Sequence, residues 1–211
     1  MKEYKLPIGC DVPETIILAD GDFPSHPLAL EWLRQCPYVV CCDGAANTYI
    51  RSGRMPEAIV GDGDSLLPDI KERYASLIHS EAEQETNDLS KAFRFCLSQE
   101  RKRITIMGAT GKREDHTIGN VSLLADYMEQ AEGSMMTDYG IFVPIREDSM
   151  FESYIGQQIS VFNMNSTALS AEGLAYPLSV FTNWWQGTLN EALARHFIIR
   201  TEGKVLVFRV F

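Results

Sequence analysis

The chain has 211 residues, which is enough for one large domain or two small ones. Apolar residues make up 45% of the sequence, so the chain can bury a substantial core and an intrinsically disordered protein is excluded. The formal net charge is −10 at pH 7 and no basic run occurs, which argues against a protein that grips a nucleic-acid backbone or an anionic membrane.

Short β-rich runs alternate with helical stretches over the first 130 residues. Strands are expected over residues 15–19, 38–42, 58–60 and 103–107. Helices are expected over residues 28–35, 45–51, 70–74, 86–99 and 116–131, with Thr86 as the cap of the fourth. Alternation of this kind predicts a mostly parallel sheet flanked by helices on both faces.

After Glu132-Gly133 the helical periodicity fades and strand patterns take over. Strands are expected over residues 140–145, 158–162, 168–172, 194–200 and 204–211. The last two flank Thr201-Glu202-Gly203, which predicts a β-hairpin. We therefore predict an α/β domain over residues 1–132 and a smaller antiparallel β-sandwich domain over residues 133–211. The second domain is small for independent stability, so we expect it to pack on the first domain or on a second subunit.

Targeting signals are not evident in the sequence. No apolar stretch approaches the roughly 20 residues of a membrane-spanning helix, and residues 1–13 lack the basic and then apolar pattern of a secretion signal. The five cysteines include no C-x-x-C pair, and Cys41-Cys42 lies in an apolar run, as is typical of buried thiols. We therefore expect a cytoplasmic protein without disulfides.

Gly and Asp residues follow each predicted parallel strand directly. The segments are Asp20-Gly21-Asp22, Asp43–Asn47, Gly61–Ser65 and Gly108–His116. Because parallel strands end at the same edge of a sheet, the four loops should gather where open α/β sheets bind ligands. Glycines and helix N-termini there present N–H groups to phosphates. The clustered carboxylates require a cation between them, and Mg²⁺ with oxygen ligands is the expected one.

Each of these signals also has a purely structural interpretation. Asp20-Gly21-Asp22 is more typical of a turn, Asp88 would stabilise a helix N-terminus, and Trp184-Trp185 is equally consistent with core packing. Asp62-Gly63-Asp64 is the stronger signal, because two carboxylates flank a glycine directly after a strand. The sequence contains no Walker A motif, no dinucleotide-binding G-x-G-x-x-G at the first helix and no Cys/His set with zinc spacing.

In these segments the chain resembles the thiamine pyrophosphokinases. The matching segments are Cys42–Asn47, Ile59–Ser65, Gln84–Ala92, Gly108–Asn120, Glu172–Leu178 and Gly187–Glu191. They cover both predicted domains in the family's order, and together they are specific although each alone is not. The resemblance implies a homodimer with active sites at the subunit interface, which transfers a pyrophosphoryl group from ATP to the hydroxyl of thiamine, giving thiamine diphosphate and AMP.

The resemblance also implies roles for individual residues. Asp62, Asp64 and Asp88 would hold Mg²⁺ and form the catalytic set with Asp115. The nucleotide would contact Asp43, Gly44, Asn47, Gly108, Thr110, Gly111, Arg113 and His116. Gln84 and Asn190 would lie near thiamine. The chain departs from the family at Leu189-Asn190, where Ser-Asn is usual, and at Gly111-Lys112-Arg113, where Gly-Gly-Arg is common.

The proposed chemistry suits these residue types. In-line pyrophosphoryl transfer depends mainly on positioning and charge neutralisation, and Arg113 is a planar donor for a phosphate or a carboxylate. The proton of the attacking hydroxyl needs an acceptor, for which Asp88, Asp115 and His116 all remain candidates. Thiamine carries a cationic ring, so Trp184 or Trp185 is an expected aromatic partner.

Two other functions fit the same residues. One is a metal-dependent phosphatase, in which Asp62 would be an aspartyl nucleophile. The other is a sensor that binds a nucleotide or thiamine without turnover.

Overall fold

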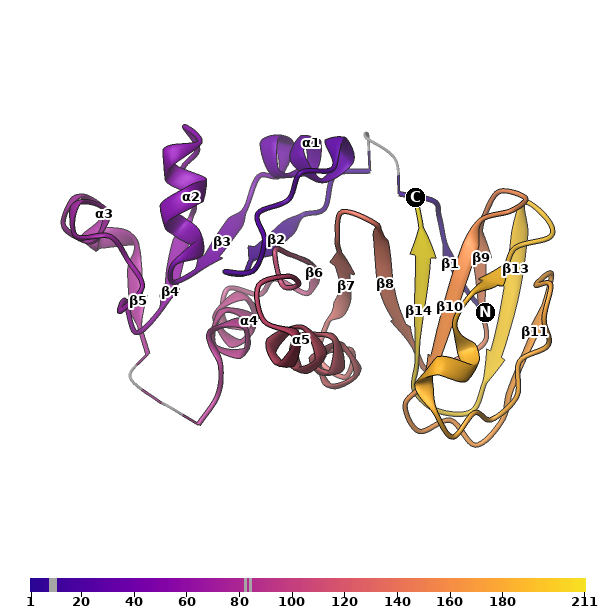
Figure 1. The fold of residues 1–211 in the computed structure, drawn as a ribbon. Helices are drawn as coiled ribbons and strands as arrows, with labels where there is room; N and C mark the ends of the chain where they lie inside the picture. Colours follow the sequence, from indigo (N-terminus) through magenta and orange to yellow (C-terminus); the bar gives the residue numbers. More distant parts are fainter. Residues whose placement is uncertain (8–10, 82, 84) are drawn as a thin grey trace. The chain divides into compact units, whose positions relative to one another are not determined.

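The computed structural model describes residues 1–7, 11–81, 83 and 85–211. The chain divides into two compact units, which are described separately (Figure 1). The α/β unit comprises Gly9–Ser122 and Gln130–Asp138. The β unit comprises Met1–Ile8, Leu123–Glu129 and Tyr139–Phe211. This division differs from the predicted boundary after residue 132, because the first residues of the chain and a short segment before Glu132 fall within the β unit.

The α/β unit is built on a parallel sheet with the strand order β7-β6-β2-β3-β4-β5 in the described part of the chain. Its strands are β2 (Thr15–Leu18), β3 (Val39–Cys42), β4 (Ala58–Gly61), β5 (Ile78–Ser80), β6 (Arg103–Met107) and β7 (Glu132–Met136). Every residue of β2, β3 and β4 is buried, as expected for strands covered on both faces. The predicted mostly parallel sheet is therefore confirmed.

Helices cover both faces of this sheet. They are α1 (Pro27–Gln35), α2 (Ala45–Arg51), α3 (Pro68–Arg73), the 3₁₀ turn η1 (Ala75–Leu77), α4 (Asp88–Ser98) and α5 (Glu114–Tyr127). Figure 1 shows α1 and α2 on one side of the strands and α4 on the other. Helix α4 packs on β3 and β4 and buries Leu89, Ala92, Phe93 and Cys96. Among the described residues, no helix combines the length and apolar character needed to cross a bilayer.

The predicted cap of α4 is wrong by one residue. Asn87, and not Thr86, is the N-cap, and its side-chain oxygen accepts a hydrogen bond from the backbone N–H of Ser90 at 2.9 Å. Thr86 instead donates its hydroxyl to Glu83 at 2.7 Å. Thr and Asn are both common N-cap residues, so the sequence does not show which of the two neighbours is the cap.

The β unit is a sandwich of two sheets. One has the order β8-β14-β10-β12 and consists of β8 (Gly140–Ile145), β14 (Val205–Val210), β10 (Gln158–Asn163) and β12 (Asn190–Glu191). The other has the order β1-β9-β13-β11 and consists of β1 (Lys2–Tyr4), β9 (Ser149–Glu152), β13 (His196–Thr201) and β11 (Leu169–Glu172). Pairing is antiparallel except between β1 and β9. The predicted β-sandwich is confirmed, with one parallel edge strand added.

The interior of the sandwich is mainly apolar, and among the described residues it contains the buried cation Arg209. Phe151 and Phe197 stack at 5.0 Å between the sheets, and both are almost completely buried. The guanidinium of Arg209, from β14, donates to the backbone oxygens of Glu152 and Lys5, each at 2.9 Å. Burial lowers the pKa of Arg209 to about 10, so the side chain stays charged at neutral pH. Arg209 therefore ties the last strand to the segment that follows β1.

The predicted hairpin at Thr201-Glu202-Gly203 is wrong. Strand β13 pairs with β9 and β11, whereas β14 pairs with β8 and β10, so these three residues carry the chain from one sheet to the other. Phe197 and Val207 point into the same core from opposite sheets. A period of two describes strands that face each other across a sandwich as well as strands that pair, so the pattern did not separate the two cases.

Candidate active site

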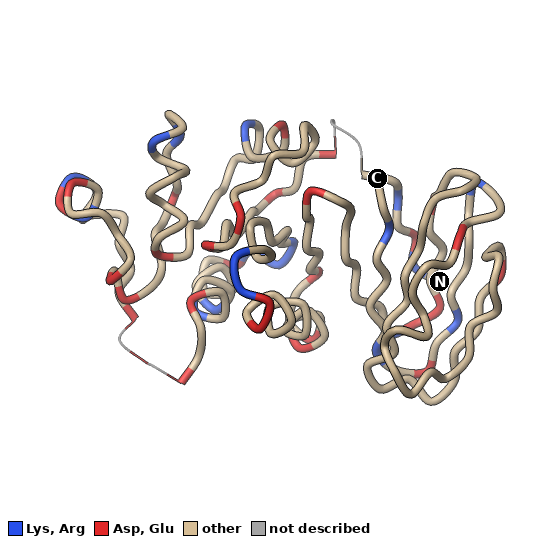
Figure 2. The backbone as a smooth tube through the Cα atoms, in the orientation of Figure 1, with Lys and Arg blue, Asp and Glu red and all other residues tan. Residues whose placement is uncertain are grey.

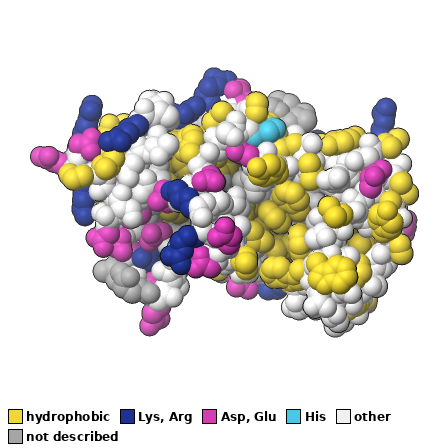
Figure 3. All heavy atoms as spheres, viewed as in Figure 1, with side chains coloured by type: hydrophobic (Ala, Val, Ile, Leu, Met, Phe, Trp, Pro, Cys, Tyr) yellow, Lys and Arg dark blue, Asp and Glu magenta, His cyan; other side chains and the backbone are white. Residues whose placement is uncertain are grey.

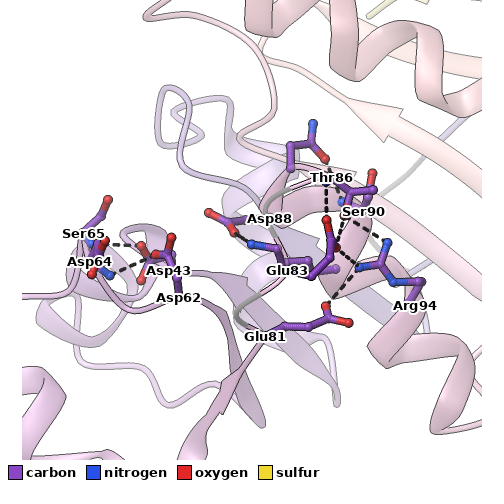
Figure 4. A network of polar contacts seen from close by, with 12 residues as sticks. Asp43, Asp62, Asp64, Ser65, Glu81, Glu83, Thr86, Asp88, Ser90 and Arg94 are labelled. Atoms are coloured by element: carbon purple, nitrogen blue, oxygen red, sulfur yellow. Dashed lines mark hydrogen bonds and ion pairs between the residues drawn. The ribbon is translucent and has the colours of Figure 1, made fainter.

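Carboxylates from two strand ends and one helix lie together in the α/β unit (Figure 4). Asp43 follows β3, Asp62 follows β4, and Asp88 begins α4. A Cβ atom built on Gly61 would lie 2.8 Å from Cβ of Asp43 and 3.4 Å from Oδ1 of Asp88. A side chain at position 61 would therefore push these two acids apart, and glycine lets them approach the same point.

Asp43 is the most buried of these acids, with 4% of its surface exposed. Its Oδ2 accepts a hydrogen bond from the backbone N–H of Ser65 at 2.9 Å. Its Oδ1 is buried and has no hydrogen-bond partner among the described residues. Burial raises the pKa of Asp43, and the negative charges of Asp88 and Asp62 raise it further. An arriving cation would satisfy the unpaired oxygen and relieve this repulsion.

The donor set fits Mg²⁺, which prefers oxygen ligands and commonly needs only one or two carboxylates beside water and phosphate oxygens. Within the ranges that the structure describes, no three His, Cys, Asp or Glu side chains already enclose a metal position. Asp62 and Asp64 belong to a turn in which Oδ1 of Asp62 accepts from the backbone N–H of Asp64 at 3.1 Å. The ammonium of Lys71 donates to the carbonyl of Gly63 at 3.0 Å and holds the centre of this turn.

Asn47 supports the same turn from α2. Its Nδ2 donates to the carbonyl of Ser65 at 2.8 Å, and its Oδ1 accepts from the backbone N–H of Leu67 at 3.0 Å. Glycine at position 44 lets the loop after β3 lie close to Asp20, because a Cβ atom there would lie 2.6 Å from Oδ2 of Asp20. Asn47 therefore holds the acidic turn in place, and the nucleotide contact that the resemblance implies for it stays a prediction.

Lys91 is a charged residue of this cluster that the sequence reasoning missed. Its side chain is 3% exposed, and its ammonium lies 3.1 Å from Oδ1 of Asp88. The two residues are three positions apart in α4, which is the spacing at which helix side chains meet. A buried lysine is rare unless it is paired, so its position offsets part of the negative charge at this edge.

The loop between β6 and α5 lies at the same edge, and Figure 2 shows basic and acidic residues side by side along it. Gly108 and Gly111 have φ angles of 63° and 80°, in the region that favours glycine. Asn120 of α5 donates to the carbonyl of Ala109 at 2.9 Å and accepts from Asn87 at 3.2 Å. These amide hydrogen bonds join the loop to the N-cap of α4, directly before Asp88.

Arg113 and Asp115 form an exposed ion pair just before and at the start of α5, with contacts of 2.5 Å and 3.0 Å. The guanidinium lowers the pKa of Asp115 to about 2. The backbone N–H of His116 donates to the same carboxylate at 3.0 Å, and the His116 side chain is exposed. Arg113 is therefore already paired and has to exchange partners to bind a phosphate.

The segment before α4 carries a second polar network (Figure 4). Arg94 donates to Glu81 at 3.1 Å, to Glu83 at 3.0 Å and to the hydroxyl of Thr86 at 3.1 Å. Gln84, which the resemblance placed near thiamine, lies outside the described residues.

The remaining predicted substrate residues lie in the β unit. Asn190 is 5% exposed, and its amide exchanges hydrogen bonds of 2.8 Å and 3.0 Å with the backbone of Tyr176. Trp184, in the 3₁₀ turn η2 (Trp184–Gly187), meets Phe162 edge-on at 6.0 Å and is 41% exposed. Trp185 is 73% exposed and Leu189 is 74% exposed. Figure 3 shows hydrophobic side chains gathered on this unit.

Two family models match this chain, one over the α/β unit and one over the β unit. Residues 29–136 match the model of the thiamin pyrophosphokinase catalytic domain, and residues 140–208 match that of the thiamin pyrophosphokinase substrate-binding domain. The chain belongs to the thiamin pyrophosphokinase family. Curated relatives of this thiamin pyrophosphokinase family member include "Thiamine pyrophosphokinase 1" of Oryza sativa subsp. japonica, which is 29% identical over 49% of each chain. "Thiamine pyrophosphokinase" of Bacillus subtilis is 34% identical over 39% of this chain and 40% of the relative.

The chain spans about half the length, or less, of the curated relatives that it matches. Solved thiamin pyrophosphokinases share its fold. The Candida albicans protein superimposes with a TM-score of 0.81 at 18% identity, covering 100% of this chain and 93% of that one. The Bacillus subtilis protein gives 0.77 at 20% identity, covering 93% and 98%.

Proposed function

We propose that this protein is a thiamine diphosphokinase, which transfers a pyrophosphoryl group from ATP to the hydroxyl of thiamine and releases AMP. The observation that carries the proposal is the match of both family domains, in order, to a chain in which the ends of β3 and β4 and the start of α4 gather Asp43, Asp62 and Asp88. The Oryza and Bacillus relatives bear the name of this activity. We propose that the protein acts as a cytoplasmic homodimer.

Magnesium is the cofactor that we assign to the acidic edge. Asp62, Asp64 and Asp88 would hold it, beside the unpaired oxygen of Asp43. When bound there, it would supply positive charge to the phosphates of ATP and to the developing charge on the leaving group.

The loop between β6 and α5 is the proposed cradle of the ATP phosphates. Gly108 and Gly111 keep its backbone free of side chains, and Thr110 lies between them. Arg113 would exchange Asp115 for a phosphate when the nucleotide arrives, because both partners are exposed. His116 follows in the first turn of α5, beside the same position.

A proton acceptor for the thiamine hydroxyl is still needed. Before the nucleotide binds, the guanidinium of Arg113 lowers the pKa of Asp115 to about 2, and this effect ends once Arg113 exchanges Asp115 for a phosphate. Asp88, Asp115 and His116 therefore all remain candidates for the proton acceptor.

Thiamine recognition is assigned to the β unit. The cationic thiazolium ring favours an aromatic face, and Trp184 and Trp185 both leave ring surface exposed. Gln84 and Asn190 are the further substrate residues proposed on the resemblance.

Product identification tests the proposal. The protein is incubated with ATP, Mg²⁺ and thiamine, and the nucleotide product is separated by chromatography. We expect AMP, and only when thiamine is present. ADP would contradict pyrophosphoryl transfer, inorganic phosphate without thiamine would support the aspartyl phosphatase, and binding without any product would support the sensor.

Two substitutions test the metal assignment. Asp62→Asn and Asp64→Asn should each lower kcat by orders of magnitude while the fold survives, because these side chains supply charge and lie outside the apolar core. Asp69→Asn is the matched control, since Asp69 is an exposed acid in the first turn of α3. Near-normal turnover in both site variants would remove them from the mechanism.

A further inference from the structure

The turn after β2 is joined tightly to the loop after β6. The backbone N–H of Gly21 donates to the carbonyl of Gly108 at 2.6 Å, and that of Asp22 donates to the carbonyl of Thr110 at 2.9 Å. A Cβ atom on Gly21 would lie only 2.4 Å from the carbonyl oxygen of Thr110, so no larger residue fits. The turn at residues 20–22 therefore fixes the backbone of the loop between β6 and α5 through these hydrogen bonds.

A side-chain clamp closes the same two segments. The ammonium of Lys112 donates to the backbone oxygen of Asp20 at 2.9 Å and to its Oδ1 at 3.0 Å. Lys112 has a φ angle of 56°, a backbone conformation that is unfavourable for a residue with a Cβ atom. The side chains of Lys112 and Asp20 are 54% and 47% exposed, and exposed ion pairs contribute little to stability. Stability therefore gives a weak reason for this arrangement.

The position of the Lys112–Asp20 pair indicates a role in binding a ligand. Oδ2 of Asp20 lies 2.6 Å from where a Cβ of Gly44 would be, so the clamp lies where the loops after β2, β3 and β6 meet. Lys91 is buried against Asp88, so its ammonium is closed to a ligand. Lys112, like Arg113, is paired with an acid in an exposed position, so its ammonium can take a polyphosphate at this loop as a further partner.

We propose that Lys112 is a nucleotide-binding residue and that Asp20 is its positioning residue. Asp20 fixes the ammonium over the loop at residues 108–113, where it contacts the phosphates of ATP. The inference rests on the proposed function, because it assumes that this loop takes ATP. It names a charged phosphate contact, and the residue that positions it, within the loop at residues 108–113 that the resemblance assigns to the nucleotide.

Binding measurements on the full chain test the clamp without requiring turnover. ATP and AMP are titrated by calorimetry in Mg²⁺ buffer into the wild-type protein, Lys112→Gly, Lys112→Arg, Asp20→Asn and the double variant. Glycine is the right replacement because it accepts the φ of position 112 without strain. Glu100→Gly is the matched control, since Glu100 is exposed and has a φ of 60° in the turn that follows α4.

We expect Lys112→Gly to weaken ATP binding about tenfold and AMP binding much less, because the charge acts on the distal phosphates. Lys112→Arg should restore most of the affinity. Asp20→Asn should weaken ATP binding only when Lys112 is present, so the double variant should bind no worse than Lys112→Gly. In steady-state assays KM for ATP should rise with little change in KM for thiamine.

Each contrary result has a distinct meaning. Equal ATP affinity of Lys112→Gly and the wild type would overturn the clamp while leaving the proposed function intact. An additive loss in the double variant would show that Asp20 does not act through Lys112. Absence of ATP binding to the wild-type protein itself would overturn the proposed function as well. Thermal unfolding of each variant separates these outcomes from a loss of fold.

Discussion

Asn190 provides the sharpest test of how the β unit is held together. The perturbation is Asn190→Asp, which keeps the size of the side chain but replaces the donor Nδ2 by an oxygen. That donor lies 2.8 Å from the carbonyl of Tyr176, and the residue is 5% exposed. The substitution removes one hydrogen bond and places a charged oxygen against a carbonyl oxygen in a buried position.

The expected cost follows from these contacts. The lost hydrogen bond and the buried carbonyl of Tyr176, which is left without a donor, together lower the free energy of unfolding by about 2–3 kcal/mol. For a chain of this size, that corresponds to a fall in Tm of about 4–12 °C. The two bonds that Oδ1 accepts, from the N–H groups of Tyr176 and Glu191, remain possible in the variant.

Thermal denaturation followed by circular dichroism measures the effect. The deficit should shrink as the pH is lowered, because the protonated carboxyl regains a donor for the Tyr176 carbonyl. Asn165→Asp is the matched control, since Asn165 is exposed and, within the described residues, bonds through its side-chain oxygen, which accepts from the backbone N–H of Lys204 at 2.7 Å. An unchanged Tm of Asn190→Asp with a raised KM for thiamine would refute this reasoning and leave substrate binding as the role of Asn190.

Three further predictions concern exposed and close-packed positions. Gly21→Ala should lower stability by about 2 kcal/mol or more, because its Cβ would lie 2.4 Å and 2.5 Å from backbone oxygens. Gly119→Ala in α5 meets nothing within 4 Å and should raise stability by about 0.5–1 kcal/mol; urea denaturation compares the two. Arg113→Met should raise the pKa of Asp115 from about 2 toward its ordinary 3.8, as followed by carboxyl NMR. A carboxyl whose pKa is lowered in the folded state adds to the free energy of unfolding above its unfolded pKa, and this contribution is lost as pH falls to the folded pKa. Between pH 3.8 and about 2, the wild type should therefore lose this contribution, and Arg113→Met, which lacks the ion pair, should not. Trp185→Ala should leave Tm unchanged and raise KM for thiamine about tenfold, and an unchanged KM would remove this ring from substrate binding.

Strands with strong burial patterns were predictable from the sequence, whereas short ones were not. The runs at Val39–Cys42 and Arg103–Met107 are apolar and bounded by turn residues, and both form strands close to the predicted limits. Strand β5 has three residues, and β7 begins with Glu132-Gly133, so neither shows a period. These segments become strands because a neighbouring strand offers hydrogen bonds, which is a property of the fold and not of the local sequence.

The candidate site was predictable to a similar extent. Parallel topology alone brings the residues after β3 and β4 together, so the meeting of Asp43 with Asp62 follows from the strand pattern. Lys91 was not predicted, because a lysine in a helix is usually solvated, and only tertiary packing buries it. The amides of Asn47 and Asn190 turn to backbone groups of distant segments, and a sequence does not show which groups those are.

The parallel edge strand β1 has a consequence for the order in which the protein is made. Lys2 pairs with Ser149, so the whole α/β unit is synthesised between the two partners. During translation, β1 therefore stays unpaired with β9 until the α/β unit has been synthesised. Closure over so long a stretch of chain is slow, and Arg209, whose guanidinium binds the backbone oxygen of Lys5, is synthesised after the α/β unit. The β unit is thus finished by its last strand, and until then the first strand is open to wrong partners.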